Sequence, residues 1–333
     1  MLEFSMIHAD FRRDALERWL STQLGGARFS LTPASEDASF RRYFRTTLDD
    51  GATFVAMDAP PEKEDCRPFV HVAGLLREAG VHAPRVHAED LAQGFLLLTD
   101  LGTRTYLQEL KPHNATQLFA DATDALIRWQ LATRADELPP YDEALLRREL
   151  QLFPDWYVSR HLGVELTNSQ KTVLEQIFAL LVKSALAQPR VFVHRDYMPR
   201  NLMLSEPNPG VLDFQDAVIG PVSYDMVSLM RDAFLSWDED RVLDWTVRYW
   251  QKAKDARLPV DADFGDFWRA FEWMGLQRHL KVLGIFARIH YRDGKPKYLS
   301  DAPRFIRYAR DVASRYSPLA PLNRLLDELK CEP

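Results

Sequence analysis

Two spacings of apolar residues follow one another along the chain, and they divide it into a first part rich in strands and a longer helical part. Residues 8–24 place apolar side chains at helical spacing. Residues 35–59 are rich in aromatic and β-branched residues on both sides of Asp49-Asp50-Gly51, which predicts a β-hairpin with its turn there. Residues 68–79 predict a helix that ends at Gly80, and the apolar run at residues 94–99 predicts a buried strand.

The spacing becomes mostly helical from about residue 113 onward. The longest amphipathic stretch covers residues 263–291, and we expect its aromatic side chains in the protein core rather than around a cofactor. This order predicts an α+β protein with two lobes, a small β-rich lobe at residues 1–101 and a larger, mostly helical lobe at residues 102–333.

Composition bounds the class of protein. The chain has 333 residues, of which 46% are hydrophobic, and this is enough for two lobes with substantial cores. A net charge of −6 without a basic stripe argues against nucleic-acid partners. No apolar run approaches the ~18 residues that a membrane-spanning helix needs, and the first residues lack a secretory leader pattern, so we expect a cytoplasmic protein. Cys66 and Cys331 are far apart in sequence and are expected as free thiols, with no obligate protein partner indicated.

The residues that carry chemistry are concentrated at positions 191–216, which read VFVHRDYMPRNLMLSEPNPGVLDFQD. A short apolar strand ends in His194-Arg195-Asp196, Asn201 follows five residues after Asp196, and a second apolar pair precedes Asp213. This is the kinase pattern H-R-D-x-x-x-x-N followed by a metal-binding Asp-Phe. We expect short strands at residues 191–193, 202–204 and 211–212, with a loop between Asp196 and Asn201.

The spacing of these polar residues suits phosphoryl transfer. That reaction needs a positioned hydroxyl, an acceptor for its proton, and divalent metal to neutralise the phosphates. Asp196 is the candidate catalytic base. Asn201 and Asp213 offer the hard oxygen ligands that Mg²⁺ prefers, so the pattern predicts ATP and Mg²⁺ as cofactors. The alternative is a kinase-shaped protein without activity.

Several segments together extend the resemblance beyond the catalytic loop. The loop, Asp213, GPVSYD and FLLLTDLG resemble the aminoglycoside phosphotransferase and choline kinase group, which implies a two-lobed protein-kinase-like fold. With SEDASFRRYFR, FVAMDAPPEKEDCRPFV, LLRRELQLFPDWYV and QRHLKVLGIFARIHYRDGKPKYL, the chain is similar to bacterial anomeric kinases of N-acetylmuramate and N-acetylglucosamine, over about residues 31–309. The resemblance implies phosphorylation of the sugar C1 hydroxyl by ATP. It further implies a role in peptidoglycan recycling that bypasses the fosfomycin-sensitive step of cell-wall synthesis.

The resemblance also assigns roles to residues outside the catalytic triplet. It gives His194 and Asp225 the role of bracing the catalytic loop. From sequence alone, Asp225 could equally be a solvent-facing residue at a helix N-terminus. Thr99, Asp100 and Leu101 match the hinge, where backbone groups bind the adenine.

Two departures from the kinase pattern concern the phosphate-binding side. The expected Gly-rich loop is replaced by Ser35-Glu36-Asp37-Ala38-Ser39, in which Ser39 could still donate to a phosphate. Met57 stands where kinases keep a phosphate-binding Lys. We expect Arg42 to supply the missing charge, although in a strand Arg41 and Arg45 would share the opposite face, and all three could simply face solvent.

The acceptor pocket is the least defined part of the site. A lactyl carboxylate on the sugar favours donor-rich surroundings, for which Arg200, Arg278 and His279 are candidates, each with surface charge as the alternative. Asp216 could bind sugar hydroxyls or cap a turn. Rival functions are an aminoglycoside or choline kinase and an inactive nucleotide-binding module. A protein kinase is disfavoured because no A-P-E segment follows Asp213.

Overall fold

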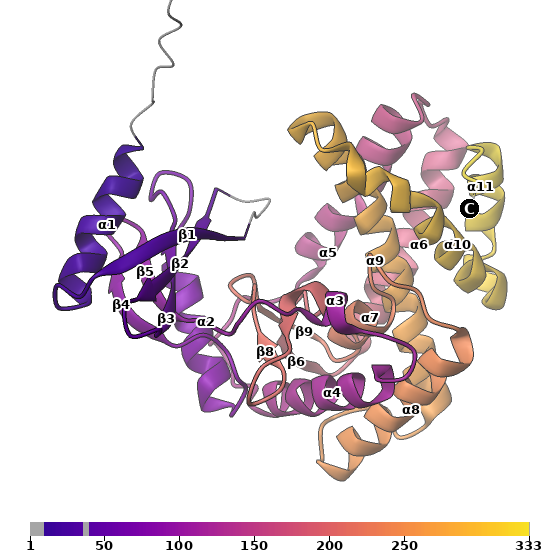
Figure 1. The fold of residues 1–333 in the computed structure, drawn as a ribbon. Helices are drawn as coiled ribbons and strands as arrows, with labels where there is room; N and C mark the ends of the chain where they lie inside the picture. The colour runs from indigo at the N-terminus through magenta and orange to yellow at the C-terminus, as the bar shows by residue number, and fades with distance from the viewer. Residues whose placement is uncertain (1–9, 36–39, 333) are drawn as a thin grey trace, which may run out of the picture. The chain divides into compact units, whose positions relative to one another are not determined.

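The chain forms two compact units in a computed structural model that describes residues 10–35 and 40–332 (Figure 1). The first unit comprises Met1–Arg104 together with Met203–Asp216, and the second comprises Thr105–Leu202 together with Ala217–Pro333. The first is built on a β-sheet and the second is mostly helical, so the predicted α+β class is confirmed.

The sheet of the first unit has five antiparallel strands in the order β1-β2-β3-β5-β4. The strands are β1 (Phe29–Ser35), β2 (Arg42–Leu48), β3 (Thr53–Asp58), β4 (Val86–Asp90) and β5 (Phe95–Thr99). The predicted hairpin is β2–β3. Its turn contains Gly51 with a φ of 87°, a left-handed conformation that glycine adopts without steric cost.

One face of this sheet is covered by helix α1 (Phe11–Gln23), which the apolar spacing predicts. Leu16, Trp19 and Leu20 of α1 form a buried cluster with Phe44, Ala56, Phe95 and Leu97 of the strands. The alternation of side chains along β2 and β3 therefore turns Phe44 and Ala56 toward α1 and leaves Tyr43 and Met57 on the other face. Each fully buried large apolar side chain contributes about 1.5–3 kcal/mol to folding.

A short segment from late in the sequence completes the first unit. It contains β8 (Gly210–Val211), which pairs with β7 (Leu202–Met203). The N–H of Val211 donates to the carbonyl of His82 at 2.7 Å, and the Phe214 ring lies 4.7 Å from that of Phe69, on helix α2 (Arg67–Glu78). These contacts place Met203–Asp216 with the strands, whereas we expected everything after residue 101 in the second lobe.

The second unit has a single long helix, α9 (Phe264–Asp293), among shorter ones in its described residues. The other helices are α3 (Tyr106–Glu109), α4 (Ala115–Leu131), α5 (Glu143–Leu150), α6 (Asn168–Ala187), α7 (Tyr224–Met230), α8 (Glu239–Asp255), α10 (Ala302–Arg315) and α11 (Pro321–Glu328), with the π-helix η1 (Phe153–His161) and the 3-10 turns η2 (Pro199–Asn201), η3 (Pro296–Asp301) and η4 (Ser317–Leu319). Strands β6 (Arg190–Val193) and β9 (Val218–Pro221) pair antiparallel.

Helix α9 is buried on several sides because η1, α6, α7 and α10 all pack against it. Its aromatic residues Phe267, Phe271 and Phe286 lie in the core, as predicted, whereas Tyr291 near its end is exposed. At Gly284 the packing against η1 leaves no space, since a Cβ there would lie 2.3 Å from the backbone carbonyl of Leu152. Because the middle of α9 is enclosed, its charged residues Glu272, Arg278 and Lys281 are buried, whereas the charged residues near its two ends are exposed.

The two cysteines are buried free thiols, as predicted. Burial raises the pKa of each thiol to about 11, for Cys66 and for Cys331. In the described part of the chain, no helix is both long and apolar enough to cross a bilayer.

Candidate active site

Strand β6 delivers the catalytic loop. Val191, Phe192 and Val193 are fully buried, and the N–H of Phe192 donates to the Thr133 hydroxyl at 2.7 Å. His194, directly after the strand, is still buried, whereas Asp196 is partly exposed. The chain then turns through η2, which ends at Asn201. The predicted strand and loop are therefore present, and they bring a carboxylate from the core to the surface of the second unit.

The loop backbone is held by Asp225, in the first turn of α7. Its carboxylate accepts hydrogen bonds from the N–H of His194 at 2.7 Å and from the N–H of Arg195 at 3.0 Å. Asp225 is fully buried, so the alternative of a solvent-facing residue is wrong. Burial raises the pKa of Asp225 to about 7, although the two N–H groups favour its charged form.

Arg195 itself has a φ of 74°, in the left-handed region that side chains other than glycine rarely adopt. Its carbonyl accepts a hydrogen bond from the Ser228 hydroxyl at 3.3 Å, so both peptide groups of this residue have partners on α7. Strained backbone of this kind persists where the surroundings over-determine it, and it is concentrated at functional sites.

The backbone of Asp196 is fixed from both sides. Its N–H donates to Nδ1 of His194 at 3.2 Å, and its carbonyl accepts from Nδ2 of Asn201 at 2.9 Å. The hydroxyl of the neighbouring Tyr197 donates to the carbonyl of Ala122 at 2.7 Å. The carboxylate of Asp196 is thus carried on a backbone with little freedom to move.

Asn201 and Asp213, the predicted metal ligands, lie in different units. The bond from Nδ2 to Asp196 orients the Asn201 amide, so that its oxygen faces away from the Asp196 carbonyl. Asp213 follows β8 and has a φ of 62°, and its carboxylate accepts a 3.0 Å hydrogen bond from the Gln215 amide. Amide and carboxylate oxygens are suitable ligands for Mg²⁺, so the donor chemistry fits this ion.

The hinge residues lie at the end of β5 and directly after it. Thr99 ends the strand, Leu101 is buried, and the Asp100 carboxylate accepts hydrogen bonds from the Arg45 guanidinium at 2.6 and 2.9 Å. Asp100 also accepts from the N–H of Gly102 at 2.9 Å. The Asp100 side chain therefore ties β2 to the hinge. Adenine binding by backbone groups of this segment stays a prediction.

Arg42 lies opposite Asp58 in the β2–β3 pair, on the face that α1 covers. Its guanidinium donates to Asp58 at 2.9 Å through Nε and also pairs with Asp10. Arg12 of α1 donates to the same Asp58 carboxylate at 2.8 Å. The role of Arg42 as a phosphate ligand stays a prediction, in which phosphate must compete with two carboxylates. The predicted contribution of Ser39 lies outside the described residues.

The four candidate sugar ligands have different surroundings. The guanidinium of Arg200 lies 5.3 Å from the Phe234 ring, and Asp216 is exposed in the other unit. Arg278 and His279 on α9 are 3% and 1% exposed, so the alternative that they are surface charges is wrong. Burial and the nearby arginines lower the pKa of His279 well below its usual value, which keeps the ring neutral. Sugar binding by these four residues stays a prediction.

Sequence reasoning missed a buried group of charges behind the catalytic loop. Glu149 of α5 forms ion pairs with Arg195 at 2.6 Å and with Lys281 of α9 at 2.8 Å. Glu149 lies in LLRREL, where three charges in succession predict a solvated helix face. Lys281 at least lies within a long apolar pattern, which is the one signal that could have suggested burial.

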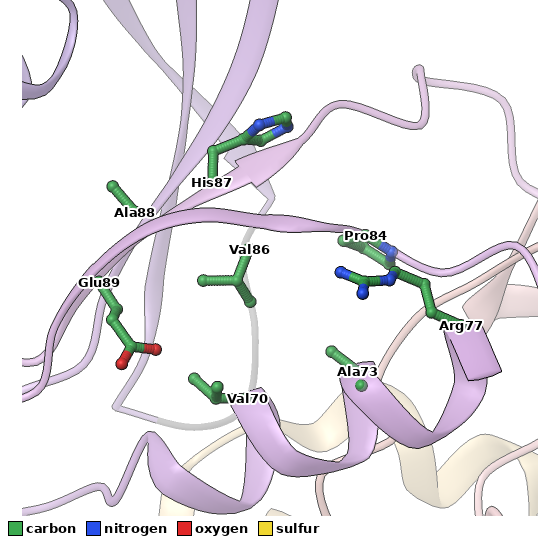
Figure 2. A pocket seen from close by; sticks show the side chains of 9 residues that line it. Val70, Ala73, Arg77, Pro84, Val86, His87, Ala88 and Glu89 are labelled. Carbon is green, nitrogen blue, oxygen red and sulfur yellow. The ribbon is translucent and has the colours of Figure 1, made fainter.

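A cavity of about 410 Å³ lies within the first unit, between α2 and β4. Figure 2 shows Val86 pointing toward Val70 and Ala73 of the helix, whereas His87 points to the other side of the strand. The charged residues that line the cavity are Arg77 and Glu89. The residues that line this cavity include none of the predicted site residues.

The comparison with protein families decides the class of the chain. The model of the "Phosphotransferase enzyme family" matches residues 30–264, more than half of the sequence. The chain belongs to this phosphotransferase enzyme family. The predicted resemblance and the prediction of a phosphoryl-transferring enzyme are confirmed.

Two curated relatives of this phosphotransferase share the same name. The chain is 62% identical to the N-acetylmuramate/N-acetylglucosamine kinase of Pseudomonas aeruginosa, over 90% of this chain and 88% of the relative. It is 50% identical to the protein of the same name from Neisseria meningitidis, over 96% of each chain. The phosphotransferase therefore matches these relatives over nearly their whole length.

Solved structures confirm the kinase-like fold. A choline/ethanolamine kinase family protein from Mesorhizobium loti superposes with a TM-score of 0.65 at 14% identity, over 93% of this chain and 98% of that one. An ADP-bound aminoglycoside phosphotransferase superposes with a TM-score of 0.57 at 15% identity, over 90% and 98% of the two chains. At these identities the likeness concerns the fold alone.

Proposed function

We propose that this phosphotransferase uses ATP to phosphorylate the anomeric C1 hydroxyl of N-acetylmuramate and N-acetylglucosamine. The observation that carries the proposal is an intact and rigidly held catalytic loop in a chain 62% identical to a kinase named for these two sugars. The aminoglycoside phosphotransferase and the choline/ethanolamine kinase family protein described above share the fold at 15% and 14% identity, so they give no comparable support for their own substrates.

Asp196 is the proposed base. Its carboxylate orients the sugar hydroxyl and accepts the proton as the oxygen bonds to phosphorus, and the fixed backbone on either side keeps it in place during the reaction. Asn201 and Asp213 would hold Mg²⁺, which when bound supplies positive charge that offsets the charge of the phosphates. Backbone groups of Thr99–Leu101 would bind the adenine, and Arg42 would contribute charge near the phosphates.

The acceptor side is proposed to be donor-rich. A carboxylate such as the lactyl group of N-acetylmuramate is best recognised by Arg or His donors, for which Arg200, Arg278 and His279 are the candidates, with Asp216 on sugar hydroxyls. Of these, Arg200 is only half-buried and lies one residue before Asn201, so it is the donor best placed to meet a substrate at the loop.

The proposed product, a sugar 1-phosphate, is an activated form from which a nucleotide sugar can be made. We therefore place the reaction in the recycling of peptidoglycan sugars in the cytoplasm, where ATP is available. This placement predicts that a cell using the enzyme tolerates fosfomycin better than one without it.

A coupled ADP-release assay with ATP and Mg²⁺ tests the proposal, run on N-acetylmuramate, N-acetylglucosamine, kanamycin and choline, with Asp196→Ala beside the wild type. Turnover on the two amino sugars that Asp196→Ala abolishes is expected. Turnover on kanamycin or choline alone would contradict the choice of substrate. ATP binding without turnover on any acceptor would favour the inactive module, for which Met57 in place of Lys is the supporting observation.

A further inference from the structure

The carboxylate of Glu149, behind the catalytic loop, accepts hydrogen bonds from four side chains. Oε1 of Glu149 accepts from the Arg195 guanidinium at 2.6 Å and from Nζ of Lys281 at 2.8 Å. Its Oε2 accepts from the Gln277 amide at 3.3 Å and from the Tyr141 hydroxyl. The side chain of Glu149 is only 6% exposed, so this is a built interior site rather than a surface ion pair.

The charges in this group are unequal. Arg195 and Lys281 bring two positive charges and Glu149 brings one negative charge, and the side chains of the two cations are 19% and 9% exposed. The Lys281 ammonium also donates to the Tyr224 hydroxyl at 2.9 Å. Because a buried charge is costly unless it is paired, both cations are stabilised by the carboxylate of Glu149 that they share.

Arg195 connects this group to the reacting side chain, because it directly precedes Asp196. Arg195 has a left-handed backbone and is held at three points. Its N–H donates to Asp225, its carbonyl accepts from Ser228, and its guanidinium pairs with Glu149. The first two partners lie on α7, whereas Glu149 lies on α5. The side-chain anchor therefore adds a constraint that the backbone bonds do not provide.

We propose that Glu149 and Arg195 are positioning residues for phosphoryl transfer, whose ion pair holds the backbone before Asp196 in the geometry that the reaction needs. The inference rests on the proposed function and extends it to two residues that the proposed mechanism does not use as base, metal ligand or substrate ligand. Lys281 is not proposed as a positioning residue and only brings a second positive charge close to Glu149. Since a displacement of about 1 Å can cost about 10²-fold in rate, breaking the pair should lower kcat by about 10²-fold.

Three variants separate positioning from packing. Glu149→Gln keeps the size of the side chain and removes its charge. Arg195→Gln removes the anchor but leaves Glu149 paired with Lys281, so it remains informative if Glu149→Gln fails to fold. Lys281→Met is the matched control, because it also removes a buried ion pair with Glu149 but leaves the Glu149–Arg195 pair with balanced charge.

Steady-state kinetics on N-acetylmuramate, with KM for both substrates, give the readout. Glu149→Gln and Arg195→Gln are expected to lose about 10²-fold in kcat with little change in either KM, and Lys281→Met is expected to keep its kcat. The double variant of Glu149 and Arg195 should lose no more than either single one, because the two substitutions break the same interaction.

Two results would overturn the inference. One is Arg195→Gln with the kcat of the wild type. The other is an equal loss of kcat in Arg195→Gln and Lys281→Met, which would mean that the loss follows from removing either buried charge and not from breaking the Glu149–Arg195 pair. The wild type in the same assay keeps the two proposals apart: without wild-type turnover the proposed function fails and this inference fails with it, whereas wild-type turnover with an unaffected Arg195→Gln overturns the inference alone.

Discussion

Asp225 accepts a 2.7 Å hydrogen bond from the backbone N–H of His194, although 31 residues separate the two in the sequence. The same carboxylate accepts from the next N–H, that of Arg195. One buried side chain in the first turn of α7 therefore determines the path of the chain just before the proposed base, Asp196.

Replacing Asp225 by Asn should destabilise the protein. The amide has one oxygen, so one of the two buried N–H groups loses its acceptor and faces an NH₂ group instead, at a cost of about 1–3 kcal/mol in the free energy of unfolding. Asp240→Asn is a matched control, because Asp240 is exposed in the first turn of α8 and should change the stability by about 0.5 kcal/mol or less. Urea denaturation of both variants measures this, and equal effects would contradict the bracing role.

The Arg42 prediction needs a control for stability, since Arg42→Ala also removes an ion pair with Asp58. Arg12→Ala removes the other guanidinium from the same carboxylate. If Arg42 binds phosphate, Arg42→Ala should weaken ATP binding about tenfold, while Arg12→Ala should leave it unchanged. Calorimetric titration with ATP and Mg²⁺ makes the comparison. Equal ATP affinity in both variants would rule Arg42 out and direct attention to Arg41 and Arg45, of which Arg45 lies on the face of Met57.

The ion pairs of Glu149 should make the free energy of unfolding depend on pH in the acid range. Burial alone would raise the pKa of Glu149, but Lys281 and Arg195 lower it from 4.5 to about 2. Because the pKa of Glu149 is lower in the folded protein than in the unfolded chain, its ionised form stabilises the fold above about pH 4.5. This stabilisation, roughly 3 kcal/mol in total, is lost as the pH falls from about 4.5 toward 2.

Wild type and Glu149→Gln should therefore differ most in stability near neutral pH, and the gap should narrow below about pH 4.5. Asp225 does not disturb the comparison, because its raised pKa acts between about pH 4 and pH 7 and is common to both proteins. Denaturation curves between pH 3 and pH 7 provide the test. A gap of the same size at both ends would show that Glu149 is not held ionised by its partners.

Two glycines offer a direct test of helix packing, Gly284 in α9 and Gly74 in α2. Gly284→Ala should destabilise by about 1–3 kcal/mol or more, because the new Cβ would meet the backbone of Leu152 and only a shift of η1 or α9 could make room. Gly74→Ala, in helix α2 with open space around the position, should instead stabilise by about 0.5–1 kcal/mol. Thermal unfolding of the two variants should therefore show shifts of opposite sign, and shifts of the same sign would contradict this packing.

The elements with a strong local pattern could be predicted from the sequence. The Asp-Asp-Gly turn predicts the β2–β3 hairpin, and the long apolar spacing predicts α9. A motif at fixed positions predicts the catalytic loop. In each case the signal is local, so no knowledge of the partner elements is needed.

The features that depend on a distant partner could not be predicted. Nothing in LLRREL indicates that Glu149 meets Arg195 and Lys281, and nothing near Arg278 indicates that neighbouring elements on several sides cover α9 and bury polar residues in its middle. Likewise Met203–Asp216 joins the first unit through hydrogen bonds to His82 and Arg104, far from it in sequence. Pairings of this kind become visible only in the folded chain.

The position of the phosphate on the product tests the central claim most directly. N-acetylmuramate is incubated with the enzyme, ATP and Mg²⁺, and the product is examined by phosphorus NMR with correlation to the sugar protons. The account predicts a phosphorus signal coupled to the anomeric proton, as in a sugar 1-phosphate, and no product with Asp196→Ala. Phosphorus coupled to the protons of any other carbon, or product of equal yield from Asp196→Ala, would contradict it.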